Sequence, residues 1–206
     1  MRDFTAVNTY AVPMDRLVGE WNPTPAELGR LTDASIDRFL ALRGGAMDEE
    51  IVFVPDDPDA ADAAAADPAD RGLAWTVAHN VVHATASGEE YAAVAAELAR
   101  GVDFHGRPRF ETPWQAVTTV EGCRRRLEES RRMRQASLLM WPDEPDLRRG
   151  YAPWRQSGWV NAQGIFAWGL AHDQGHHAQV ERILGQARMS RANGTAPPVV
   201  GGGVLG

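Results

Sequence analysis

Apolar residues recur at helical spacing in four long stretches of the chain. The first stretch begins at Thr24-Pro25, because threonine is a favourable N-cap and proline suits the first helical position. A similar pair, Thr112-Pro113, begins the third stretch. No convincing set of alternating strands accompanies them, so the pattern predicts an all-α four-helix bundle. The predicted helices span about 24–43, 73–100, 112–140 and 160–189.

The segments between these helices carry weaker signals. The apolar run Ile51–Val54 could form a short extended piece. Residues 56–70 are almost all Asp, Ala and Pro, and we expect a solvated loop there. Residues 143–158 are predicted to form a polar loop, and the Gly- and Pro-rich tail 193–206 is expected to be disordered.

Composition narrows the class of protein. The net charge of −7 disfavours nucleic acid, whose phosphates bind concentrated basic surfaces. No apolar run approaches the roughly 18 residues that a membrane span needs. The single cysteine, Cys123, excludes an intrachain disulfide and suits a reducing compartment. We therefore expect a cytoplasmic protein without nucleic-acid or membrane partners, with a single domain over 1–206 and a helical core at about 20–190.

The third predicted helix is rich in arginine. Arginines at 124–126 and 131–132 are interleaved with Glu128 and Glu129. Such interleaving is typical of a solvated helix face with intrahelical ion pairs, so we do not expect an anion site there. Cys123 lies in this helix with no histidine adjacent in sequence, and it is not proposed as a nucleophile.

One sequence pattern, W-x-x-A-H-x-x-x-H, occurs twice, about ninety residues apart. On a helix, residues i and i+4 lie on the same face, so each copy predicts two histidines pointing in one direction. Two such helices facing one interior can surround a metal ion. The alternative is a set of core histidines without a ligand, which would leave many ring nitrogens unpaired. The two copies contain Trp75, His79 and His83, and Trp168, His172 and His176; Gln179 follows on the second face.

These residues resemble a known family. The stretch 75–84 resembles the first signature of the DinB-like superfamily, in which a tryptophan is followed eight residues later by a metal-binding histidine. The stretch 172–182 resembles its second signature, H-[DE]-x-x-H-x-x-Q-[IV]. The resemblance covers about residues 20–190. It implies a four-helix bundle with up-down-down-up topology and a long crossover, often assembled as a homodimer. The metal ligands that it implies are His83, His172 and His176.

The remaining histidines have less definite roles. His79 stands where the family more often has Glu or another polar residue. It could be a fourth ligand, a partner behind a ligand, or a proton-transfer group facing the substrate. A position about 100° around the helix from His176 favours a partly exposed surface location for His177. His105 has no partner by spacing and is taken as incidental.

Three imidazoles suit several divalent metals, and the resemblance favours zinc or nickel, with iron(II) also compatible. An open site of this kind can lower the pKa of a thiol or activate water. The resemblance favours S-transfer from a mycothiol-type thiol to a small electrophilic substrate. A non-catalytic metal-binding stress or scaffold protein, a specialised biosynthetic enzyme and a hydrolase are the alternatives. The expected pocket residues are Trp75, Trp168, Trp159 and Gln179, with His79 as the catalytic group.

Overall fold

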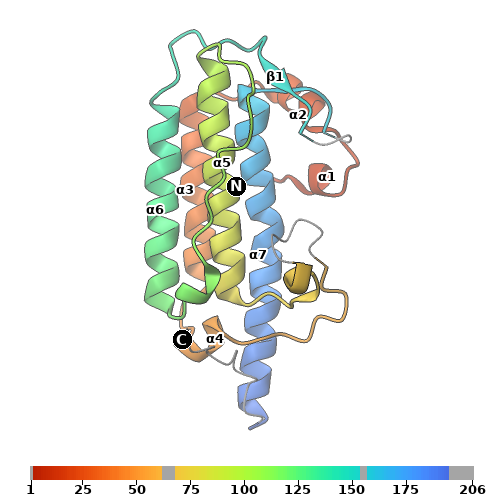
Figure 1. Cartoon of the computed structure of the whole chain (residues 1–206), viewed down its shortest axis with the longest axis vertical. Helices are drawn as coiled ribbons and strands as arrows, with labels where there is room; N and C mark the ends of the chain where they lie inside the picture. Colours follow the sequence, from red (N-terminus) through yellow and green to blue (C-terminus); the bar gives the residue numbers. More distant parts are fainter. Residues whose placement is uncertain (1, 62–67, 154–156, 195–206) are drawn as a thin grey trace.

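The computed structural model describes residues 2–61, 68–153 and 157–194. Four long helices form a bundle, and the prediction of an all-α fold is confirmed. In Figure 1, α3 and α7 run in one direction and α5 and α6 in the other. The helix α5 packs against α6 and α7, and α3 packs against the same two helices from the opposite corner. The bounds are α3 (Pro25–Leu42), α5 (Val77–Ala99), α6 (Val120–Leu138) and α7 (Ala162–Ala192).

Each long helix begins at a side-chain cap. The Thr24 hydroxyl accepts a hydrogen bond from the Glu27 backbone N–H, as the sequence predicted. Thr76 caps α5, so that helix begins four residues later than predicted and Trp75 precedes it. Thr119 caps α6, which therefore begins eight residues after the predicted start at Thr112.

The predicted start of the third helix at Thr112 was wrong for a local reason. Pro113 has an extended ψ of 117°, and Val117 is also extended. The residues between them form only a 3-10 turn, η2 (Trp114–Ala116). Because extended residues flank this turn on both sides, it cannot continue into a helix.

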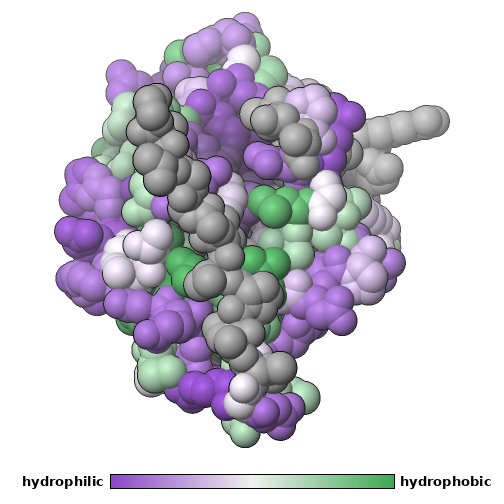
Figure 2. Space-filling model, turned by 60° about the horizontal axis from the view of Figure 1, so that its bottom comes forward, coloured by the Kyte–Doolittle hydropathy of each residue, from purple (hydrophilic) through white to green (hydrophobic). Residues whose placement is uncertain are grey.

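Smaller elements close the two ends of the bundle. The prediction of an extended piece at 51–54 was wrong at its start, because Ile51 ends the helix α4 (Asp48–Ile51). At that end of the bundle, apolar side chains gather in the middle of a hydrophilic rim (Figure 2). The predicted polar loop contains one strand of a two-stranded antiparallel ladder, β1 (Gly150–Tyr151) with β2 (Val160–Asn161), in which Gly150 pairs with Asn161.

Two short N-terminal helices, α1 (Thr5–Asn8) and α2 (Met14–Trp21), were not predicted and pack on α7. In the predicted loop 56–70, a 3-10 turn η1 (Pro68–Gly72) is present, and 62–67 lie outside the described residues. Most of the predicted tail, 195–206, also lies outside them. None of the described helices is both long enough and apolar enough to cross a membrane.

The arginine-rich helix α6 is only partly the solvated face that was predicted. Arg124 is exposed and pairs with Glu121 one turn before it. Arg126 departs from the prediction, because it is half-buried and pairs with Glu89 of α5. A guanidinium carries enough donors to join neighbouring helices, so part of this face is an interhelical contact.

A long connection joins α5 to α6. After α5 ends, residues 102–113 run back along that helix toward η2 (Figure 1). We call this segment the crossover strap. It is tied to α5 by a bidentate ion pair between Arg107 and Glu90 and by a 2.8 Å hydrogen bond from Arg109 to the Ser87 hydroxyl. The strap thereby forms one wall above the middle of the bundle.

Candidate metal centre

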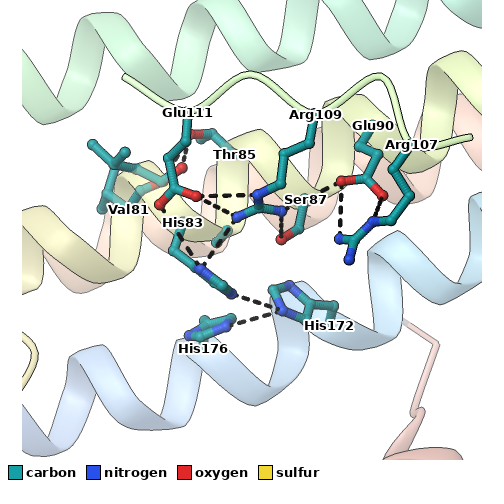
Figure 3. A network of polar contacts seen from close by, with 12 residues as sticks. Val81, His83, Thr85, Ser87, Glu90, Arg107, Arg109, Glu111, His172 and His176 are labelled. Carbon is teal, nitrogen blue, oxygen red and sulfur yellow. Dashed lines mark hydrogen bonds and ion pairs between the residues drawn. The ribbon is translucent and has the colours of Figure 1, made fainter. Parts of the chain in front are cut away.

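Three histidines from facing helices meet in the middle of the bundle. His83 comes from α5, and His172 and His176 come from α7 (Figure 3). The Nε2 atom of His172 lies 3.3 Å from Nε2 of His83 and 3.3 Å from Nε2 of His176. The candidate ligand atoms of all three lie within 4.8 Å of one another, which makes the group able to hold one metal ion.

Close packing of α5 and α7 makes this convergence possible. A Cβ added at Gly169 would lie 3.4 Å from the Tyr91 side chain and 3.5 Å from the Cα of Gly88, so the two helix backbones approach closely where both residues are glycine. His83 precedes Gly88 on α5, and His172 follows Gly169 on the antiparallel α7. Both imidazoles therefore extend from the same level of the helix–helix contact.

All three imidazoles are held neutral. Burial, helped by the neighbouring His176, lowers the pKa of His83 from 6.5 to about 2. Burial likewise lowers the pKa of His176 to about 4 and that of His172 well below its usual range. A neutral imidazole has a free lone pair on one ring nitrogen, which is the form that binds metals.

The surroundings of His176 determine which ring nitrogen carries that lone pair. Its Nδ1 lies 2.9 Å from the Asn80 side-chain oxygen and 3.1 Å from the Gln179 side-chain oxygen. Both partners are acceptors, so Nδ1 carries the proton and donates. The Nε2 lone pair consequently faces the other two histidines, as metal binding requires. Gln179, expected in the pocket, instead lies behind His176.

The other two histidines have different surroundings at Nδ1. The Nδ1 atom of His172 is buried and has no hydrogen-bond partner among the described residues. The Nδ1 atom of His83 faces the crossover strap, 3.3 Å from Nη2 of Arg109 and 3.9 Å from Oε1 of Glu111. Neither Arg109 nor Glu111 was predicted as a site residue, although the alternation Arg107-x-Arg109-x-Glu111 is a period-two signal for an extended segment whose side chains face one way.

His79 lies outside the group formed by His83, His172 and His176, which we call the histidine triad. Its ring is stacked between two indoles, with centroids 4.3 Å from Trp75 and 5.0 Å from Trp114. Trp114 was not predicted as a site residue, because a helix was expected from Thr112 where the 3-10 turn η2 forms. Of the three roles considered for His79, this position disfavours that of fourth ligand. The side chain instead borders the pocket described next.

A pocket of about 810 Å³ opens beside the triad. It is lined by His83, His172 and His79, by aromatic side chains, and by the strap residues Arg107, Arg109 and Glu111. The aromatic residues that line it are Trp75, Trp114, Trp168, Tyr91 and Tyr10. The structure thus brings Trp75 and Trp168 together with the histidines, in a space large enough for small organic molecules.

Trp159, which was expected in this pocket, lies elsewhere. It is 49% exposed and lines a separate hollow of about 270 Å³ with Asp15 and Val18 of α2. The reason is the β1–β2 ladder, which lies at one end of the bundle (Figure 1) and whose second strand begins at Val160, directly after Trp159.

A neighbouring face of α7, about 100° around the helix from the three histidines, carries a buried polar network. Arg134 of α6 is 1% exposed and forms a bidentate ion pair with the fully buried Asp173. The Ser35 hydroxyl also donates to Asp173. His177 donates from Nε2 to the Ser35 carbonyl oxygen at 3.0 Å and packs against Phe39. The expectation that His177 is partly exposed was wrong, because α3 covers this face of α7.

Two residues that were not expected to take part in the site, Cys123 and His105, lie away from it. Cys123 is buried between helices, and burial raises the pKa of its thiol from 9.0 to about 11. His105 is exposed and lies 3.2 Å from the Glu97 carboxylate on the outside of the molecule. Neither residue lines the pocket that contains the triad.

Comparison with known proteins agrees with this arrangement. No curated protein and no solved structure gave a significant match to the chain. The family model of the DinB superfamily matches residues 31–180, which include most of α3, all of α5 and α6, and the ligand-bearing part of α7. Because this match covers well over half of the sequence, the chain belongs to the DinB superfamily.

Proposed function

We propose that the protein is a metal-dependent transferase that moves a low-molecular-weight thiol, of the mycothiol type, onto a small electrophilic substrate. His83, His172 and His176 would hold a divalent ion, with zinc or nickel favoured and iron(II) also compatible. The observation that carries the proposal is the convergence of three neutral imidazoles, two of which, His83 and His172, line an 810 Å³ pocket. Three protein ligands leave coordination positions open toward such a pocket.

When bound, the ion would supply Lewis acidity, which lowers the pKa of a thiol that reaches it. The chain's own residues would do the rest. Trp75 and Trp168 would exclude water from the sulfur and pack against the apolar parts of the substrates. Arg107 is 49% exposed at the pocket wall, and Figure 3 shows its remaining nitrogen directed away from Glu90, where it could donate to a polar group of the second substrate.

His79 would move the proton. It does not belong to the triad, but it lies one helical turn before His83 and borders the same pocket. In the proposed step the thiol proton passes to a ring nitrogen of His79, and the sulfur forms a bond to the electrophilic carbon. The leaving group departs with the electron pair of the broken bond, and His79 returns the proton to it or to solvent.

The test begins with the metal. The protein is purified without chelators, and its metal content is measured by elemental analysis. It is then reloaded with Zn²⁺, Ni²⁺ or Fe²⁺ and assayed for consumption of mycothiol, bacillithiol, glutathione or cysteine with a chromogenic electrophile. His176→Ala should lose both metal and thiol consumption. The matched control is His105→Ala, an exposed histidine outside the pocket, which should change neither.

Two outcomes would contradict the proposal at different levels. Failure of His176→Ala to lower metal content would refute the ligand set. If the triad binds metal but the protein consumes none of the thiols, the transferase activity is refuted. The remaining alternatives are then a hydrolase or a non-catalytic metal-binding protein. His79→Ala separates catalysis from metal binding: it should keep the metal while lowering turnover by about 10²–10⁴-fold, as expected for loss of a general base.

A further inference from the structure

The crossover strap and α5 form a ladder of polar contacts that ends at a triad histidine. Alternate residues of an extended segment point in one direction, whereas helix residues three or four apart share a face. On the strap these residues are Arg107, Arg109 and Glu111, and the facing residues of α5 are Glu90, Ser87 and His83. Figure 3 shows the strap side chains pointing toward α5 in this order.

At the end of this ladder, a hydrogen-bond donor, Arg109, and an acceptor, Glu111, both face the Nδ1 atom of His83. Arg109 Nη2 lies 3.3 Å from His83 Nδ1, and Glu111 Oε1 lies 3.9 Å from the same atom. A guanidinium only donates hydrogen bonds, and a carboxylate only accepts them. Arg109 therefore favours the tautomer with the lone pair on Nδ1, whereas Glu111 favours the tautomer with the proton there.

The two tautomers differ in their ability to bind a cation. With the lone pair on Nδ1, the Nε2 proton of His83 points at the other two histidines. Nε2 of His172 lies only 3.3 Å from Nε2 of His83. With the proton on Nδ1, the Nε2 lone pair faces that centre. Only the second tautomer can contribute Nε2 to a metal site, and it needs an acceptor at Nδ1.

We propose that Glu111 is a positioning residue that accepts the Nδ1 proton of His83 when the triad binds a divalent cation, and that Arg109 opposes this tautomer. The inference rests on metal binding by the triad, as proposed above, and not on the thiol chemistry. Arg109 already holds the other carboxylate oxygen, Oε2, at 3.1 Å from Nε and 2.5 Å from Nη2. Oε1 itself lies 3.9 Å from His83 Nδ1, and a movement of about 1 Å would bring it within hydrogen-bonding distance.

The two strap residues make opposite predictions for metal affinity. Glu111→Ala should weaken Zn²⁺ binding by about 10–100-fold, the usual effect of losing such a partner. Arg109→Met should leave the affinity unchanged or increase it, because it removes the donor that stabilises the wrong tautomer. If the pair served only to fasten the strap, the two variants would weaken binding equally, since either one breaks the same ion pair.

The experiment measures Zn²⁺ affinity of the full chain by competition with a chelating dye, with circular dichroism of the metal-free variants as a check on folding. Arg149→Met, which breaks the ion pair with the strap residue Asp103 away from the pocket, is the matched control and should bind Zn²⁺ like the wild type. Nitrogen-15 NMR of the Zn²⁺ form should show His83 protonated at Nδ1. Protonation at Nε2, or equal losses for the two main variants, would overturn the inference. Zn²⁺ binding that is insensitive to His176→Ala would instead overturn the proposed function.

Discussion

The buried ion pair between Arg134 and Asp173 allows a quantitative test of what holds the ligand-bearing helix in place. Asp173 directly follows His172 on α7, and Arg134 reaches it from α6 with distances of 2.5 and 3.1 Å. Arg134 also donates to the Ser130 hydroxyl and to the Ala84 carbonyl oxygen. The pair thus joins α5, α6 and α7 on a face of α7 next to the one that carries the histidines.

Removing one partner should be costly because the other is left charged in the core. Arg134→Met and Asp173→Leu should each lower the free energy of unfolding by about 3–5 kcal/mol. For a chain of this size, that corresponds to a fall in Tm of roughly 6–20 °C. The double variant should be more stable than either single variant, because two apolar side chains of similar volume leave no unpaired charge.

The assay is urea unfolding of the metal-free protein, followed by circular dichroism, for the wild type and the three variants in one double-mutant cycle. A coupling free energy of at least about 2 kcal/mol between Arg134 and Asp173 is expected. Single variants that cost less than about 1 kcal/mol, against the 3–5 kcal/mol expected for breaking a buried pair, would refute the reasoning. Costs that simply add in the double variant would show that the two residues stabilise the bundle independently.

Three further results are expected. Gly88→Ala should destabilise the protein by about 1–3 kcal/mol in urea unfolding, because the new methyl group would overlap the buried Arg134 guanidinium. Gly185→Ala, on an open face of α7, should instead stabilise it by up to about 1 kcal/mol in the same assay. The Cys123 thiol, buried with a pKa raised to about 11, should react with a thiol reagent at pH 8 only after unfolding, and equal reactivity of the native protein would contradict this. The free energy of unfolding should also fall as the pH rises from 9 toward 11, because the thiol ionises first in the unfolded state. The pKa of His176 lies at about 4 in the folded state, below its unfolded value of 6.5, so the unfolded state binds more protons between these two pH values. The metal-free protein should therefore lose stability as the pH falls through that range, and a urea midpoint that stays constant between pH 7 and 4.5 would contradict this.

The sequence by itself determined the fold class and the candidate ligands. Helical periodicity is a local property, and capping residues such as Thr24 act on backbone groups a few positions away, so the long helices could be predicted from the chain alone. The paired i,i+4 histidines likewise depend only on helix geometry. That two such pairs could surround one metal ion also followed from this geometry, whereas the choice of His83, His172 and His176 as ligands came from the resemblance to the DinB-like superfamily.

Only the tertiary structure decided which other residues surround the triad. Glu111 reaches the site from the crossover strap, and Trp114 reaches it from the η2 turn that follows. The path of the strap along α5 depends on contacts such as that of Arg107 with Glu90, which no helical repeat predicts. His177 is buried because α3 covers that face of α7, which no pattern within α7 could reveal. Local periodicity specifies the direction of a side chain relative to its own helix, but burial and partners depend on which segments pack against that helix, and packing is settled by long-range contacts.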